Sequence, residues 1–175
     1  MNGRLILVSG GLRSGKSRYA LERAAAERGP VLFVATGVAT DPDMAERIAR
    51  HRAERPPAWR TLEARYNLKT AIEGALADER TVLVEDLGTL VTNLIVERDA
   101  ADEAVEAEVD GLIALPAGCR VRLLVVSNEV GWGLVPTTPL GRRFADLLGR
   151  ANQRLAAQAD EVVVVVAGLP LRLKP

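Results

Sequence analysis

The sequence has little cysteine and little histidine. Its 175 residues include a single cysteine, Cys119, and a single histidine, His51. One cysteine cannot form a disulfide within the chain, and such low counts supply no Cys/His cluster of the kind that binds zinc. Cys119 could be a reactive thiol, but a structural thiol beside the strand that follows it is the favoured interpretation. The counts fit a protein of a reducing compartment.

An excess of charge and a long hydrophobic run are also missing. Lysine and arginine together number 23, and so do aspartate and glutamate. This balance gives no electrostatic reason to expect binding to nucleic acid or to an anionic membrane. No apolar run approaches the length of a membrane span, and residues 5–8 are too few for a signal peptide. We expect a cytoplasmic protein with no membrane span and no nucleic-acid partner.

Short apolar runs alternate with longer helical patterns along the chain. With 48% hydrophobic residues, a chain of this length can form one domain, residues 1–175, around one core. Buried strands are predicted over residues 5–9, 31–35, 81–85, 121–127 and 161–167. Helices are predicted over residues 17–28, 42–55, 68–78, 101–115 and 140–159, with residues 116–118 marking a helix end. The order predicts an α/β fold of the P-loop NTPase type, with a mainly parallel sheet between helices on both faces. Residues 169–174 could add an antiparallel edge strand at the C-terminus.

The clearest motif is a glycine-rich phosphate loop between the first strand and the first helix. Gly10 and the run Gly15, Lys16, Ser17 match the pattern of glycine, four residues, then Gly-Lys-Ser. Glycine lets backbone N–H groups approach a phosphate closely, and the helix that follows presents its N-terminus to the anion. Lys16 is expected to reach the outer phosphates and Ser17 to hold Mg²⁺. Arg13 could add charge at the phosphates or face solvent.

A pair of acidic residues ends the third predicted strand. Glu85 and Asp86 follow the apolar run 81–84, where P-loop enzymes place a carboxylate that supports the metal. In an extended chain the two side chains point to opposite sides, so only one of them can face the site. The pattern leaves open which of the two does so, and two ordinary charges at the end of a strand are the alternative.

The only histidine lies in a segment rich in arginine. The arginines are Arg47, Arg50, Arg52 and Arg55. Nearby cations disfavour the imidazolium form of His51 and leave a neutral nitrogen that could attack phosphorus. A solvated basic helix end that carries an incidental histidine is the alternative. The segment by itself favours that alternative.

Several stretches of the chain together resemble one enzyme family. They are residues 10–18, 34–36, 44–52, 55–56, 59–63, 91–94, 127–136 and 149–156. On these motifs, the chain resembles the bifunctional adenosylcobinamide kinase/adenosylcobinamide-phosphate guanylyltransferase family of adenosylcobalamin biosynthesis. The resemblance covers nearly the whole chain and is far more specific than the phosphate loop alone.

The resemblance implies two reactions. The first phosphorylates the aminopropanol hydroxyl of adenosylcobinamide with ATP or GTP. The second transfers GMP from GTP to adenosylcobinamide phosphate through a covalent GMP-histidine, and His51 matches that histidine, which reverses the preference stated above. Similar proteins have a mainly parallel sheet and assemble as homotrimers.

The resemblance also implies a set of site residues. Lys16 and His51 are the expected catalytic residues, and Ser17 and Glu85 the expected Mg²⁺ ligands. The expected nucleotide-binding positions are Gly10, Gly11, Leu12, Arg13, Ser14, Gly15, Lys16, Ser17, Ala35, Thr36, Gly37, Arg52, Ala53, Glu54, Arg55, Glu63 and Glu85. The chain departs from the family at Asp86, where a cysteine is expected, and at Gly88, which replaces a common hydroxyl residue. Neither departure touches the phosphate loop or His51.

A further loop follows the fourth predicted strand, where α/β folds bind ligands. It runs from Asn128 through Gly131 and Trp132. Trp132 could cover a flat ligand, and a structural loop with a buried tryptophan is the equal alternative. Asn152 and Arg154, on the helix that follows, are assigned no role.

Three other functions account for less of the sequence. A P-loop kinase of another small metabolite explains Lys16, Ser17 and Glu85 but leaves His51 idle. A GTP-binding switch protein needs an Asn-Lys-x-Asp motif after a late strand, and the sequence contains none. Residues 146–149 fit a switch-like spacing, but they lie in a predicted helix and follow no strand. A mechanical ATPase needs further domains that 175 residues do not supply.

Overall fold

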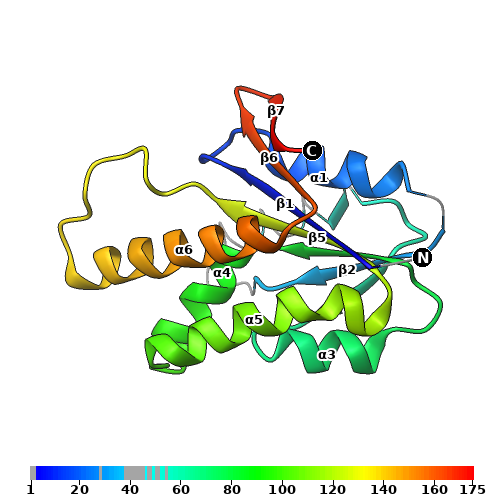
Figure 1. Ribbon diagram of the computed structural model, residues 1–175, viewed down its shortest axis with the longest axis horizontal. Coiled ribbons are helices and arrows are strands. Elements are labelled where there is room, and N and C mark those ends of the chain that lie inside the picture. The colour runs from blue at the N-terminus through cyan, green and yellow to red at the C-terminus, as the bar shows by residue number, and fades with distance from the viewer. Residues whose placement is uncertain (1–2, 28, 38–45, 47–48, 50–51, 54) are drawn as a thin grey trace.

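The structure is a computed structural model that describes residues 3–175 except 28, 38–45, 47–48, 50–51 and 54 (Figure 1). Its strands are β1 (Arg4–Gly10), β2 (Val31–Ala35), β3 (Arg60–Glu63), β4 (Thr81–Glu85), β5 (Arg122–Asn128), β6 (Glu161–Val166) and β7 (Leu169–Lys174). Its helices are α1 (Lys16–Ala25), α3 (Leu68–Ala75), α4 (Leu87–Thr92), the π-helix η1 (Asn93–Glu97), α5 (Asp102–Cys119) and α6 (Pro139–Gln158). None of the helices in these described ranges is long and apolar enough to cross a bilayer.

The described strands form one seven-stranded sheet in the order β3-β2-β4-β5-β1-β6-β7. All neighbouring strands are parallel except β6 and β7, which form an antiparallel pair. The predicted α/β fold and its antiparallel C-terminal edge strand are therefore confirmed. In this order β5 lies between β4 and β1, so the carboxyl ends of these three strands are adjacent.

Helices cover both faces of the sheet, as predicted. Figure 1 shows α1 on one face, while α3, α4, α5 and α6 lie on the other. Side chains of β1 alternate between the two: Leu5 and Leu7 join the larger core, and Ile6 and Val8 join the smaller core beneath α1. The strands are apolar on both faces because both faces are covered.

Several elements differ from the sequence prediction. Strand β3 was not predicted, because its four residues are mostly polar and exposed at the sheet edge. The helical run α4–η1 was missed, although Leu87, Leu90 and Leu94 are spaced as one buried helix face.

The predicted helix end at residues 116–118 is wrong, because α5 continues to Cys119. Proline removes one N–H, but Leu115 and Pro116 are buried, so packing against the core holds the last turn. The helix ends instead at Arg120, whose φ of 56° is left-handed. The helix predicted over residues 42–55 lies mostly outside the described residues.

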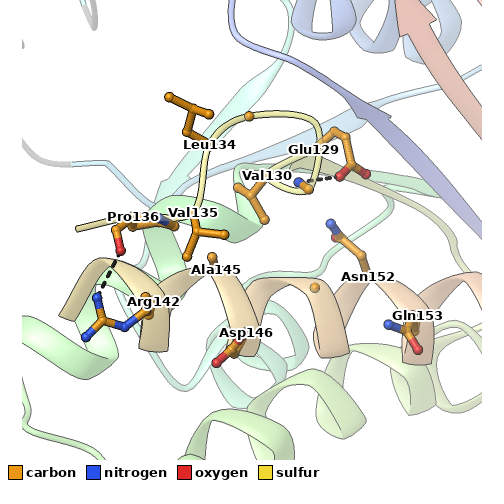
Figure 2. Close-up of a pocket in the computed structure, with 13 residues that line it drawn as sticks. Glu129, Val130, Leu134, Val135, Pro136, Arg142, Ala145, Asp146, Asn152 and Gln153 are labelled. Atoms are coloured by element: carbon orange, nitrogen blue, oxygen red, sulfur yellow. Dashed lines mark hydrogen bonds between the residues drawn. The ribbon is translucent and has the colours of Figure 1, made fainter. Parts of the chain in front are cut away.

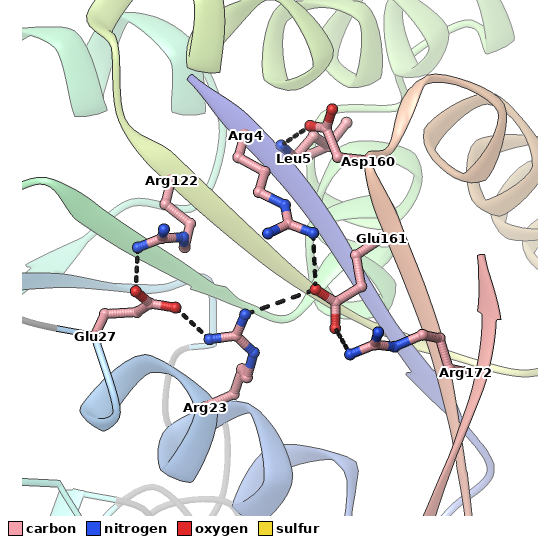
Figure 3. Close-up of polar contacts among 8 residues, drawn as sticks. All are labelled: Arg4, Leu5, Arg23, Glu27, Arg122, Asp160, Glu161 and Arg172. Atoms are coloured by element: carbon pink, nitrogen blue, oxygen red, sulfur yellow. Dashed lines mark hydrogen bonds and ion pairs between the residues drawn. The ribbon is translucent and has the colours of Figure 1, made fainter. Parts of the chain in front are cut away.

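An ion-pair network links α1 to the amino ends of β1, β5 and β6 and to Arg172 of the antiparallel strand β7 (Figure 3). The carboxylate of Glu161 is only 2% exposed. Its partners are Arg4 at 3.2 Å, Arg23 at 3.6 Å and Arg172 at 3.5 Å. Glu27 pairs with both Arg23 and Arg122. These ion pairs connect the carboxyl end of α1 to β1, β5, β6 and β7. They therefore fix the helix at the end opposite to the phosphate loop.

Candidate active site

The phosphate loop joins β1 to α1 and curls over the start of the helix. Gly15 precedes the helix with a φ of 95°, a left-handed conformation that favours glycine. The Ser14 N–H donates to the carbonyl of Gly11 at 3.2 Å, and Nζ of Lys16 donates to the same carbonyl at 3.2 Å. The Lys16 side chain therefore folds back along the loop, and the residue is 6% exposed.

Residues that follow the neighbouring strands β5 and β6 hold the loop at two points. The Gly168 N–H donates to the Ser14 carbonyl at 2.8 Å, and the Glu129 N–H donates to the Gly10 carbonyl at 3.0 Å. A Cβ at position 10 would lie 2.6 Å from the carbonyl oxygen of Val165, so only glycine fits there. At the tip, Leu12 and Arg13 are exposed, which favours the interpretation that Arg13 faces solvent.

Glu85 is the carboxylate that faces the phosphate loop. It lies at the end of β4 and accepts a hydrogen bond from the hydroxyl of Ser17. Burial raises the pKa of Glu85 to about 7, and the charge of Asp86 adds to this shift. The hydrogen bond from Ser17 and the positive charges of Lys16 and Arg55 offset part of it. Desolvation thus outweighs the hydrogen bond and the positive charges in setting the pKa of Glu85.

Asp86 has a different place in the structure. Its carboxylate caps α4 by accepting a hydrogen bond from the Thr89 N–H at 2.6 Å. This is the ordinary use of aspartate at the start of a helix. Glu85 therefore faces the phosphate loop, and Asp86 caps α4.

Thr36, which directly follows β2, supports the end of β4. Thr36 is fully buried, and its hydroxyl lies 3.0 Å and 2.9 Å from the carbonyl oxygens of Glu85 and Asp86. The same hydroxyl accepts a hydrogen bond from the Asp86 N–H at 2.8 Å. The amide of Asn93 donates to the Thr36 carbonyl at 2.9 Å. Sequence reasoning gave Asn93 no role, and its contact with Thr36 bridges 57 positions. Ala35 and Gly37, on either side of Thr36, are partly exposed.

Arg55 lies on the α1 face of the sheet. Its guanidinium carbon is 3.5 Å from the centroid of the Phe33 ring, and Nη1 lies 3.4 Å from the Thr61 hydroxyl. Burial lowers the pKa of Arg55, while the negative charge of Glu85 opposes that shift. A guanidinium over an aromatic ring is held in place yet keeps its N–H groups at the ring edge.

The other expected residues of this segment lie nearer to solvent. Arg52 and Glu63 are exposed and form an ion pair at 3.9 Å, and Ala53 is exposed beside them. His51 and Glu54 lie outside the described residues. Arg52 and Arg55 nevertheless lie near the end of the sheet that carries Glu85.

The departure at Gly88 has a structural counterpart. A Cβ at position 88 would lie 2.6 Å from the side-chain nitrogen of Asn128 and 3.3 Å from Oδ1 of Asp86. The amide of Asn128 thus occupies the space that a side chain would take. Asn152 fixes the end of β5, because it accepts from the Ser127 hydroxyl at 2.5 Å and donates to the Asn128 carbonyl at 3.0 Å. No role was expected for Asn152 from the sequence.

The described residues contain no group of three or more His, Cys, Asp or Glu side chains that could hold a metal ion. The hydroxyl of Ser17 and the carboxylate of Glu85 are hard oxygen donors, which are the ligands that Mg²⁺ prefers. The donor set fits a magnesium–nucleotide complex.

Comparison with known proteins gives a consistent result. Residues 6–173 match the model of the family described as "CobU: Cobinamide kinase / cobinamide phosphate guanyltransferase". The chain is 43% identical over 181 aligned positions to the bifunctional adenosylcobalamin biosynthesis protein CobU of Salmonella typhimurium strain LT2, covering 97% of this chain and 99% of the relative. It is 41% identical to the Escherichia coli K12 protein of the same name, with the same coverage. It is also 41% identical to the bifunctional adenosylcobalamin biosynthesis protein CobP of Pseudomonas aeruginosa strain PAO1, covering 96% of each chain. The chain therefore belongs to the cobinamide kinase/cobinamide phosphate guanyltransferase family.

Proposed function

We propose that the protein phosphorylates adenosylcobinamide and then converts the product to adenosylcobinamide-GDP. One observation carries this proposal: Ser17, at the end of a complete phosphate loop, donates a hydrogen bond to Glu85. The chain also matches the family over nearly its whole length. The same resemblance supports one nucleotide-binding domain over residues 1–175 and a homotrimeric assembly.

In the kinase step, the hydroxyl oxygen of adenosylcobinamide attacks the γ-phosphorus of ATP or GTP, and the nucleoside diphosphate leaves. The loop backbone and Lys16 hold the triphosphate and stabilise charge on its outer oxygens. Ser17 and Glu85 would hold Mg²⁺, which supplies charge neutralisation at the phosphates. No protein nucleophile is needed, because positioning and electrostatics account for most of the catalysis in such reactions.

In the second step, a nitrogen of His51 attacks the α-phosphorus of GTP and pyrophosphate leaves. A phosphate oxygen of adenosylcobinamide phosphate then attacks the same phosphorus, which releases His51 and forms the diphosphate bond. The family resemblance supports His51 as the nucleophile, and no other histidine is available in the chain. Arg52 and Arg55, close to it in sequence, supply positive charge for the transferring phosphate.

The experiment that tests this function uses GTP labelled on the α-phosphate. The protein should acquire label that acid removes and base does not, as a phosphoramidate requires, and adenosylcobinamide phosphate should discharge it. GTP labelled on the γ-phosphate is the control and should leave the chain unlabelled. A protein that phosphorylates cobinamide yet never acquires α-label would contradict the guanylyl-transfer half of the proposal.

A further inference from the structure

The loop that follows β5 leaves the sheet beside the candidate nucleotide site. Because β5 lies between β4 and β1, this loop begins between Glu85 and Gly10. Its first residue, Glu129, donates its N–H to the Gly10 carbonyl at 3.0 Å. Whatever binds under residues 129–136 is therefore adjacent to the phosphate loop.

A cavity of about 450 Å³ separates this loop from α6. Figure 2 shows Val130 and Val135 turned towards the helix, and Leu134 turned away from it. The helix lines the cavity with two small residues, Ala145 and Gly149. Nothing lies within 4 Å of a Cβ built at Gly149, so the helix surface is open there.

Hydrogen bonds hold both ends of the loop, and its middle is exposed to solvent. Its first turn is closed by the Glu129 carboxylate, which accepts from the Gly131 N–H at 2.7 Å. At the other end, Nη1 of Arg142 donates to the carbonyls of Pro136 at 3.0 Å and Thr137 at 2.9 Å. Between these ties three apolar residues are exposed, namely Trp132 (68%), Leu134 (97%) and Val135 (77%). Contiguous apolar side chains with this exposure mark a binding surface.

Polar groups from α6 complete the lining of the cavity. Asp146 and Gln153 both line it, and neither forms a hydrogen bond or ion pair with a residue that the structure describes. A carboxylate accepts hydrogen bonds, and a primary amide both donates and accepts them. A ligand that carries amide groups on an apolar frame would satisfy these side chains and cover the exposed part of the loop.

We propose that this cavity binds the corrinoid acceptor, with one amide-bearing arm inside it and the edge of the corrin ring on residues 132–135. The inference rests on the proposed function, because that function supplies a large apolar macrocycle with primary amide arms. A cavity of about 450 Å³ is too small for the ring, so the ring lies over the loop. The hydroxyl-bearing arm is then left to reach past Glu129 to the phosphate loop.

The test fills the cavity from its helical side. Gly149→Leu adds a side chain where the structure has open space, and it also replaces glycine by a good helix former. The KM for adenosylcobinamide in the kinase reaction should rise at least about tenfold, because the new side chain would block the contact between the amide-bearing arm and the cavity. The KM for GTP should stay within about twofold, because no phosphate-loop residue is altered.

Gly74→Leu is the matched control. Gly74 lies in α3, is exposed, and has nothing within 4 Å of a Cβ. This variant should leave both KM values unchanged. A second variant, Leu134→Ser, removes a side chain that is 97% exposed and cannot unfold the core. It should also raise the KM for adenosylcobinamide.

The outcomes separate the two proposals. If the wild-type protein phosphorylates no corrinoid, the proposed function itself is wrong. An active wild type with an unchanged acceptor KM in both Gly149→Leu and Leu134→Ser overturns the cavity assignment alone. A change in sedimentation mass with an unchanged acceptor KM also overturns it, and would identify the loop as a contact between subunits.

Discussion

The hydroxyl of Ser17, in the first turn of α1, donates a hydrogen bond to the carboxylate of Glu85 at the end of β4. The two residues are 68 positions apart in the chain, yet they meet because β4 and β1 flank β5 in the sheet. This contact links the phosphate-binding half of the site to its acidic half. Glu85 itself is half-buried, and desolvation raises its pKa to about 7.

The first prediction concerns stability in the absence of nucleotide. The pKa of Glu85 rises from 4.5 to about 7 on folding, mainly through burial, so the folded state favours the protonated form. The free energy of unfolding therefore falls as the pH rises from 4.5 to about 7, and the loss is complete above that range. Glu85→Gln removes the ionisation and should stabilise the protein at pH 8 by on the order of 2 kcal/mol.

Urea denaturation of wild type and Glu85→Gln at pH 4.5 and pH 8 measures this difference. The two proteins should differ little at the lower pH. Equal stability differences at both pH values would show that burial does not perturb Glu85 in this way.

The second prediction separates the two adjacent acids. Glu85→Gln should raise the Mg²⁺ concentration needed for half-maximal kinase activity by about tenfold or more, because one hard oxygen ligand loses its charge. Asp86→Asn should change it little, since asparagine is also a good helix cap. A Mg²⁺ titration of both variants at saturating nucleotide gives the comparison. A larger effect from Asp86→Asn would mean that the metal lies on the other carboxylate.

The third prediction concerns the phosphate loop. Lys16→Ala should abolish both reactions, with a loss of at least about a hundredfold in kcat/KM for each, because both need the triphosphate at one loop. Arg18→Ala removes a positive charge from the same helix, but its side chain is 71% exposed, so near-normal rates are expected. Initial rates of phosphoryl and guanylyl transfer would be measured separately. Guanylyl transfer that survives in Lys16→Ala would show that GTP sits elsewhere for the second reaction.

The fourth prediction uses two glycines in helices. Gly74→Ala should stabilise the protein by roughly 0.5–1 kcal/mol, because the position is open and alanine favours the helix. Gly88→Ala should lack this gain, since its Cβ would displace the Asn128 amide from 2.6 Å. Thermal or urea unfolding of both variants provides the measurement. Equal gains at the two positions would show that Asn128 moves aside without cost.

The sequence predicted the parts of this structure that have local signals. Strand β2 begins and ends where its apolar run does, and the phosphate loop is a contiguous motif. Strand β3 was missed because an exposed, polar edge strand leaves no such pattern.

The contacts that position the site were harder to predict. Asn93 supports Thr36, and Asn152 supports Asn128, across 57 and 24 positions of sequence. Neither partner can be chosen until the order of the strands is known. The different positions of the Glu85 and Asp86 side chains were predictable in part. Successive side chains of a strand point to opposite faces, so only one of the two can face the loop.

The fifth prediction is that His51→Ala separates the two reactions. Guanylyl transfer through a covalent intermediate needs a nucleophile, and the chain has no second histidine. Phosphoryl transfer to an alcohol depends on the phosphate loop and Glu85, which the substitution leaves intact. The variant should therefore lose GMP labelling and formation of adenosylcobinamide-GDP, and keep measurable cobinamide kinase activity.

A thermal melt of His51→Ala beside wild type shows whether loss of activity reflects loss of the fold. Arg52→Ala is a useful companion, because it removes a neighbouring exposed charge and keeps the histidine. It should retain GMP labelling at a reduced rate. Labelling that persists in folded His51→Ala would rule out this histidine as the nucleophile, and loss of both reactions would mean that His51 also shapes the kinase site.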